Sequence, residues 1–305
     1  MKNNSLFRAA LLPMFFFAVT LFAQERESGL YKSVVVTPVN SFTIGVEGPA
    51  VDKNGILYAV NYGRQGTIGK VTPEGVAEIF VVLPEGSIGN GIRFGSHGNM
   101  LIADYTGHNI LKVNMKTKEV SVFAHEPVMS QPNDIAIDSK NRLYASDPDW
   151  KGGTGRVWRI DTSGKTALLD SMGTTNGIEV SPDEKILYVN SSRKIWAYDL
   201  SKNGETGNKR LLIEFPDFGM DGMRCDIEGN LYVARFGKGV IAIVSPGGKL
   251  VREVPLTGKR PTNVAFGGKD GRTMYVTIQD QGNIESFRTE IPGREWKMQQ
   301  KARRR

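Results

Sequence analysis

The chain has 305 residues, of which 40% are hydrophobic and 23% charged, and it contains a single cysteine. The hydrophobic content excludes a disordered chain, and the lone cysteine excludes a fold held by internal disulfides. The formal charge is +7, but residues 1–23 carry +2 and residues 294–305 carry +5, which leaves residues 24–293 neutral. A neutral body argues against a basic face that binds nucleic acid.

The first 23 residues have the pattern of a secretory signal peptide. Lys2 and Arg8 precede an apolar run from Ala9 to Ala23, and a polar segment ends it. We therefore expect export to the periplasm or the cell exterior, with cleavage after Ala23. Leu21 is larger than the cleavage site prefers, so a retained anchor is the alternative. Beyond this segment no apolar run reaches the ~20 residues that span a bilayer, and stable membrane insertion of the mature chain is not expected.

One pattern of two strands recurs six times along the chain. The first strand of each copy reads, in order, EGPAVD (Glu47–Asp52), NGIRFG (Asn90–Gly95), NDIAID (Asn133–Asp138), NGIEVS (Asn176–Ser181), DGMRCD (Asp221–Asp226) and TNVAFG (Thr262–Gly267). These copies begin 43, 43, 43, 45 and 41 positions apart. A second strand follows each, as in ILYAV (Ile56–Val60), after turn residues such as Asn54-Gly55, which is typical of a β-hairpin.

Short antiparallel strands that repeat every ~40–45 residues are typical of a β-propeller with one four-stranded sheet per repeat. The sequence therefore predicts an all-β, six-bladed β-propeller with four-stranded antiparallel blades over residues 24–293. The strand KSVVVTP (Lys32–Pro38) is predicted to pair with the last blade and close the ring, which removes exposed strand edges. Residues 294–305 are expected to form a solvated, frayed basic tail, with binding to an anionic surface as the minor alternative.

The residues that open the repeats are candidates for a metal site, because the innermost strand of each propeller blade lines the central channel. All six carry a side-chain oxygen: Glu47, Asn90, Asn133, Asn176, Asp221 and Thr262. Hard oxygen ligands with two negative charges suit Ca²⁺, and the lack of His or Cys argues against zinc or copper. At any one position, an Asn or Asp that satisfies loop backbone groups is the simpler interpretation. The convergence of all six favours a metal.

The second strand of each repeat returns to the same mouth, so the residues at its end are expected to surround the ring. Candidate substrate contacts there are Asn61, Asp104, Tyr105, Asp147 and Arg235, with Trp150 in a loop that could fold over the opening. The alternative for the aromatic residues is that they cap the packing of the blades. The single cysteine, Cys225, is predicted to be an inert thiol buried between blades.

These segments resemble the senescence-marker-protein (regucalcin), gluconolactonase and luciferin-regenerating-enzyme family over about residues 40–285. The sharpest are QPNDIAIDSKNRLYASDP (Gln131–Pro148), TNGIEVSPDEKILYVN (Thr175–Asn190) and DGMRCDIEGNLYVA (Asp221–Ala234). The resemblance implies a divalent metal, usually Ca²⁺, held by the matching residues Glu47, Asn133, Asn176 and Asp221. It also implies hydrolysis of sugar lactones, with Asp221 as general base or proton shuttle and Asn133 as a contact to the substrate.

One position departs from the family pattern. Animal members often carry Arg where this chain has Gln131, so a cationic contact to the substrate is either missing or supplied elsewhere, for instance by Arg235. The sequence as a whole predicts an exported, metal-dependent lactonase that acts on a small-molecule ester, with the ion polarising its carbonyl. Two alternatives remain at this point. One is a non-catalytic, Ca²⁺-stabilised propeller that binds a carbohydrate or a protein. The other is an enzyme resembling strictosidine synthase, which would not need the full ligand set.

Overall fold

The structure is a computed structural model that describes residues 29–303. The predicted signal peptide, residues 1–23, lies outside the described residues, as do residues 304 and 305 of the basic tail. Among residues 29–303, no helix is both long and apolar enough to cross a membrane.

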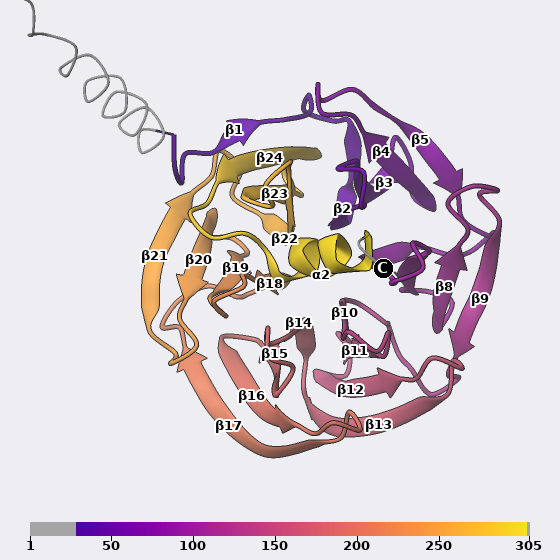
Figure 1. The fold of residues 1–305 in the computed structure, drawn as a ribbon, viewed down its shortest axis with the longest axis vertical. Helices are drawn as coiled ribbons and strands as arrows, with labels where there is room; N and C mark the ends of the chain where they lie inside the picture. Colours follow the sequence, from indigo (N-terminus) through magenta and orange to yellow (C-terminus); the bar gives the residue numbers. More distant parts are fainter. Residues whose placement is uncertain (1–28, 304–305) are drawn as a thin grey trace, which may run out of the picture.

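Within this range the chain forms six four-stranded antiparallel sheets that surround a central axis, as Figure 1 shows. Each blade is given from the axis outwards. Blade 1 contains β2 (Phe42–Val51), β3 (Leu57–Tyr62), β4 (Thr67–Val71) and β5 (Ala77–Val82), and blade 2 contains β6 (Gly89–Phe94), β7 (Met100–Asp104), β8 (Asn109–Val113) and β9 (Val120–His125). Blade 3 contains β10 (Ile135–Ile137), β11 (Leu143–Asp149), β12 (Thr154–Ile160) and β13 (Thr166–Gly173).

Blades 4 and 5 continue the same order. They contain β14 (Thr175–Val180), β15 (Ile186–Ser191), β16 (Lys194–Leu200) and β17 (Thr206–Glu214); then β18 (Met223–Cys225), β19 (Leu231–Arg235), β20 (Val240–Val244) and β21 (Leu250–Pro255). Blade 6 contains β22 (Pro261–Gly267), β23 (Thr273–Ile278) and β24 (Asn283–Arg288), with β1 (Val34–Val35) as its outermost strand. The predicted six-bladed β-propeller is confirmed.

The ring is closed by the N-terminal strand, as the sequence predicted. In β1, Val34 pairs with Ser286 and Val35 with Glu285 of β24, so the sixth blade combines both ends of the propeller. The buried hydroxyl of Thr37 accepts a hydrogen bond from the amide of Ile284 at 3.0 Å and continues this contact. This pairing closes the ring and satisfies backbone hydrogen-bonding groups of β24 without a disulfide.

The hairpins follow from local turn chemistry. In the third repeat, Oδ1 of Asp138 accepts hydrogen bonds from the amides of Lys140 at 3.0 Å and Arg142 at 2.9 Å. Asn141 takes a positive φ of 62°, which asparagine tolerates better than most residues. The side chain of Asp138 therefore fixes the turn that joins β10 to β11. Asp52 and Asp226 accept equivalent hydrogen bonds from backbone amides and fix the corresponding turns of blades 1 and 5.

The hydrophobic core is divided between neighbouring blades. Val60 of blade 1 packs with Ile92 and Ile102 of blade 2, for example, and all three are fully buried. Cys225 packs in the cluster between blades 4 and 5 and is 2% exposed. Burial, followed by the charge of Glu179, raises the pKa of its thiol well above the ordinary value. The prediction of an unreactive buried thiol is consistent with this placement.

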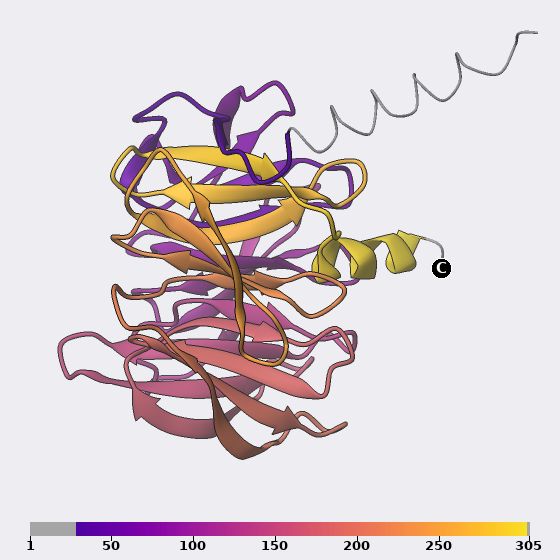
Figure 2. The ribbon, with the colours of Figure 1, turned by 90° about the vertical axis from the view of Figure 1, so that its left-hand side faces the viewer.

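The C-terminal segment differs from its prediction. Arg294–Arg303 form helix α2, which lies across the propeller axis in Figure 1 and projects from one face of the disc in Figure 2. Arg294 is 3% exposed, donates to the carbonyl of Ile137 at 3.0 Å and pairs with Glu179 at 3.5 Å. The expectation of a solvated, frayed tail is therefore wrong for this helix, because its first turn finds buried carboxylate partners inside the propeller.

Candidate metal and active site

A cavity of about 640 Å³ opens where the six inner strands begin. All six residues that open the repeats line it: Glu47, Asn90, Asn133, Asn176, Asp221 and Thr262. Glu47, Asn133 and Asn176 are less than 10% exposed, and Asp221 is partly exposed to the cavity. The spacing of the repeats thus places these six oxygen-bearing side chains, called the ring below, around one opening, as the sequence predicted.

Glycines directly after the ring residues allow the inner strands to converge. A glycine follows the ring residue in four repeats: Gly48, Gly91, Gly177 and Gly222. A Cβ atom on Gly48 would lie 1.9 Å from the carbonyl oxygen of Asn90, and one on Gly222 would lie 2.0 Å from the side chain of Asn263. Gly48 also has a positive φ of 55°. Only glycine both lacks a Cβ atom and readily takes a positive φ, so the glycine that follows the ring residue has a steric cause.

The two carboxylates of the ring lie in an environment that disfavours their charge. Burial and the neighbouring charge of Asp134 raise the pKa of Glu47 to about 7, against hydrogen bonds from the amide of Gly48 and the side chain of Asn263. Burial and the charge of Glu47 raise the pKa of Asp221 well above its ordinary value, although Asn176 donates a hydrogen bond to it. A cation among these oxygens would reverse both shifts.

Three amide oxygens of the ring have no partner among the described residues. The Oδ1 atoms of Asn90, Asn133 and Asn176 are buried and accept no hydrogen bond within residues 29–303. Buried polar atoms are normally paired, so three such oxygens in one cavity call for a ligand. Together with Glu47 and Asp221 they form a set of hard oxygen donors that fits Ca²⁺ better than a softer metal.

Carboxylate, imidazole and thiol groups alone do not make a metal site in the described part of the chain. Within residues 29–303 there is no group of three or more His, Cys, Asp or Glu side chains that could hold a metal ion. A site with two carboxylates needs amide oxygens or water to complete a shell of six to eight ligands. The ring contains such amides at the positions where the repeats carry Asn.

Two residues behind the ring were not predicted from the sequence. Nδ2 of Asn263 donates to Oε2 of Glu47 at 3.0 Å, and Asp134 accepts from Nη1 of Arg224 at 3.1 Å and Nη1 of Arg93 at 3.4 Å. Asn263 and Asp134 occupy the second position of their repeats, which is glycine in the other four copies. That exception to the pattern was the sequence signal that could have identified them.

Charged side chains fill the channel beneath the ring. Arg93, Glu179 and Arg224 occupy the fourth position of their repeats and are at most 2% exposed. Side chains alternate along a strand, so the second and fourth positions share the channel-facing side. Glu295 of α2 forms ion pairs with Arg93 and with Arg224, the second at 3.9 Å. Helix α2 therefore closes the end of the channel opposite to the cavity.

Three of the predicted rim residues line the cavity: Asn61, Tyr105 and Trp150. Trp150 is 47% exposed, and burial raises the pKa of the Tyr105 phenol, against hydrogen bonds with Trp150 and Gln131. Asn61 uses its amide for the backbone, donating to the carbonyl of Gly45 at 2.7 Å and accepting from the amide of Gly66 at 3.1 Å. Tyr105 and Trp150 are thus the rim side chains best placed to meet a ligand.

The other three rim predictions are not retained as substrate contacts. Asp104, Asp147 and Arg235 are fully buried and lie outside the cavity lining. Asp104 accepts a hydrogen bond from the hydroxyl of Ser87 at 2.9 Å, and Asp147 accepts from the amide of Gln131 at 2.7 Å. Each therefore fixes a loop of the rim rather than facing the cavity.

Arg235 is held in the same manner. Its Nη2 pairs with Oδ1 of Asp217 at 2.7 Å, and its guanidinium lies 3.7 Å from the ring centroid of Phe215. It is consequently committed to the loop before Asp221 and cannot replace the cationic contact that is absent at Gln131. The structure keeps Arg235 in a supporting role for the rim.

Known proteins share both the sequence pattern and the fold. Residues 45–280 match the SMP-30/Gluconolactonase/LRE-like region family. A gluconolactonase from Zymomonas mobilis is 26% identical over 90% of this chain and 87% of its own, and a diisopropyl-fluorophosphatase from Loligo vulgaris is 25% identical over 85% and 93%. The crystal structure of a calcium-binding protein, regucalcin from Agrobacterium tumefaciens, matches with a TM-score of 0.75 at 21% identity, over 85% of this chain and 94% of that one. This chain belongs to the SMP-30/gluconolactonase/LRE-like family, as the resemblance of its repeats predicted.

Proposed function

We propose that this protein is a metal-dependent lactonase that hydrolyses sugar lactones. The observation that carries the proposal is the convergence on one cavity of two carboxylates and of three amide oxygens that have no partner within residues 29–303. Membership of the family and the similarity to a gluconolactonase over most of both chains support a lactone as substrate.

Four residues of the ring would hold the ion: Glu47, Asn133, Asn176 and Asp221. Ca²⁺ suits this donor set because every candidate ligand is an oxygen and only two carry charge. When bound, a divalent cation supplies Lewis-acid polarisation of the lactone carbonyl and stabilises the developing oxyanion.

Asp221 would act as the general base and proton shuttle. It takes a proton from the attacking water, whose oxygen then bonds to the carbonyl carbon. The ester C–O bond breaks, and the proton passes to the leaving alkoxide, so that the product is the open hydroxy acid. Burial and the charge of Glu47 raise the pKa of Asp221 in the metal-free site, and a bound cation would lower it again, so Asp221 would act as a weak base or as a proton shuttle.

The remaining cavity residues bind and orient the substrate. The amide group of Asn133 can donate to the lactone, and the side chains of Tyr105 and Trp150 form an aromatic wall at the rim. Aromatic surfaces suit the apolar face of a sugar ring and help to exclude water from the reacting bond.

The proposal is tested by assaying the purified protein against a panel of sugar lactones, with acid release followed by a pH indicator. Hydrolysis with Ca²⁺ that stops with excess chelator and returns with added metal is the expected result. Chelation that lowers only the melting temperature, with no turnover on any lactone, would instead support a calcium-stabilised binding propeller.

We also propose that the protein is exported. The support is the cationic start and apolar run of residues 1–23, which match a signal peptide. Fractionation of the native cells should recover the protein outside the cytoplasm, and deletion of residues 2–23 should retain it inside. Equal distribution of both forms would refute export by this segment.

A further inference from the structure

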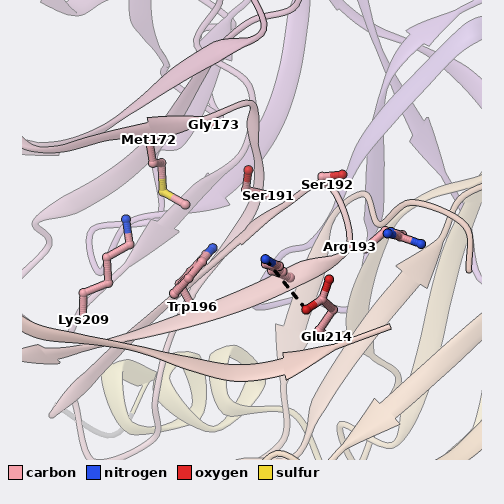
Figure 3. A pocket seen from close by; sticks show the side chains of 9 residues that line it. Met172, Gly173, Ser191, Ser192, Arg193, Trp196, Lys209 and Glu214 are labelled. Atoms are coloured by element: carbon pink, nitrogen blue, oxygen red, sulfur yellow. Dashed lines mark ion pairs between the residues drawn. The ribbon is translucent and has the colours of Figure 1, made fainter. Parts of the chain in front are cut away.

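A second cavity of about 540 Å³ lies beside the metal site, and we call it the side groove (Figure 3). Its walls come from the end of β13, the hairpin of β15 and β16, and β17, and they include Met172, Arg193 and Trp196. Ser192 lines both the side groove and the main cavity. The two cavities therefore share Ser192 as a wall residue and are neighbours.

The side groove carries an unbalanced positive charge at this junction. Lys194 pairs with Glu214 at 3.7 Å, the contact marked in Figure 3, and Lys209 pairs with Asp170 at 2.7 Å. Arg193 is exposed, donates to the carbonyl of Pro216 at 2.6 Å and has no carboxylate partner among residues 29–303. Its guanidinium therefore remains free to pair with an anionic group on a ligand.

The middle of the side groove offers a surface for a sugar ring. The indole of Trp196 is half-buried in its wall, with Met172 beside it in Figure 3, and Nζ of Lys209 lies 5.1 Å from the centroid of its ring. The hydroxyls of Ser191 and Ser192 line the same space and make no hydrogen bond within the described part of the chain. A half-buried indole, two hydroxyls and the cations of Arg193 and Lys209 match a sugar that carries an acidic group.

We propose that the side groove is a subsite for an acidic second sugar, so that the preferred substrate is the lactone of an acidic disaccharide. This inference rests on the proposed lactonase function. The lactone ring would occupy the main cavity, while a linked uronic acid would place its ring against Trp196 and its carboxylate at Arg193. A neutral monosaccharide lactone would fill the main cavity alone and would gain nothing from these residues.

The test compares three substrates: gluconolactone, cellobionolactone, and its counterpart with glucuronic acid at the far end. Arg193→Gln should raise KM about tenfold for the acidic disaccharide only, which is the usual effect of losing a charge-assisted hydrogen bond. Trp196→Ala should raise KM for both disaccharides and leave gluconolactone unchanged. Lys249→Gln removes an exposed cation outside the groove and should alter none of the three.

The proposal is overturned if both groove variants hydrolyse all three lactones as the wild type does. A protein that hydrolyses no lactone would refute the lactonase function, and calorimetric titration with the acidic disaccharide then tests the groove directly. Binding that weakens about tenfold in Arg193→Gln supports the subsite, and equal or absent binding in both proteins overturns it. Unchanged melting temperatures of the variants exclude a loss of folding as the cause.

Discussion

Nδ2 of Asn263 donates a hydrogen bond to Oε2 of Glu47 at 3.0 Å, although 216 residues separate them in the chain. The bond joins the inner strands of the last and first blades, β22 and β2, at the mouth of the channel. The closure of the propeller thus orients one carboxylate of the candidate metal site. Stability of the ring and affinity for the ion are expected to be linked through this contact.

Asn263→Ala should weaken binding of Ca²⁺ about tenfold, because loss of a residue that orients a ligand typically costs 10- to 100-fold in affinity. Calorimetric titration of the metal-free protein measures the effect. Asn208→Ala is the matched control, since this exposed amide on the outermost strand β17 bonds only the side chain of Asp199 on β16. An unchanged affinity in Asn263→Ala would show that Glu47 needs no such support.

Asp221→Asn should lower kcat on a sugar lactone by at least about 100-fold, the usual contribution of general acid–base catalysis. The fold should persist, because the substitution preserves the shape of the side chain and relieves repulsion with Glu47. Assays at saturating Ca²⁺ separate this loss from weaker metal binding, and Asp183→Asn serves as an exposed control. Full residual activity would remove Asp221 from the proposed mechanism.

Affinity for Ca²⁺ should fall as the pH falls below about 7. The pKa of Glu47 is raised to about 7 in the metal-free site, and that of Asp221 is raised as well, so protons compete with the ion below this range. Above pH 7 the competition by Glu47 is lost and affinity should level off. Calorimetry in two buffers of different ionisation enthalpy counts the released protons. Binding without proton release at pH 6 would contradict the raised pKa of Glu47 in the metal-free site.

Glu295→Gln should lower the free energy of unfolding by about 3 kcal/mol, because removing one partner of a buried ion pair leaves the other charge uncompensated. Its carboxylate pairs with Arg93 and Arg224 inside the channel, and its side chain is only 21% exposed. Urea denaturation measures the loss. Lys297→Gln, an exposed change on the same helix, should have little effect, and equal stability of the two variants would refute the role of α2 as a closing element.

The repeat spacing was sufficient to predict the blades and the ring. Each copy begins with an oxygen-bearing residue at nearly constant spacing. Equivalent positions in the blades of a propeller surround its axis, so these residues lie around one opening. The pairing of β1 with β24 was predicted on a different ground, because a strand that precedes the first repeat can close the ring and cover its exposed edges. The blades and the ring depend on strand patterns that recur in all six repeats.

The directions of the rim side chains could not be predicted in this way. Asp104, Asp147 and Arg235 lie near the ends of the second strands as expected, but each is held by a partner on a neighbouring loop, and loop partners follow no repeat. Helix α2 posed a similar difficulty. Its basic composition favours solvation, and only the folded channel brings Arg294 to Glu179, which lies 115 residues earlier in the chain.

The central claim is that the ring holds a divalent ion, and an anomalous difference map tests it most directly. Crystals grown with Mn²⁺, a hard ion that occupies oxygen sites and scatters anomalously, should show one strong peak among Glu47, Asn133, Asn176 and Asp221. The peak should be absent from crystals of Asp221→Ala grown in the same conditions. A wild-type map with no peak at the ring, at metal concentrations that support turnover, would contradict the account.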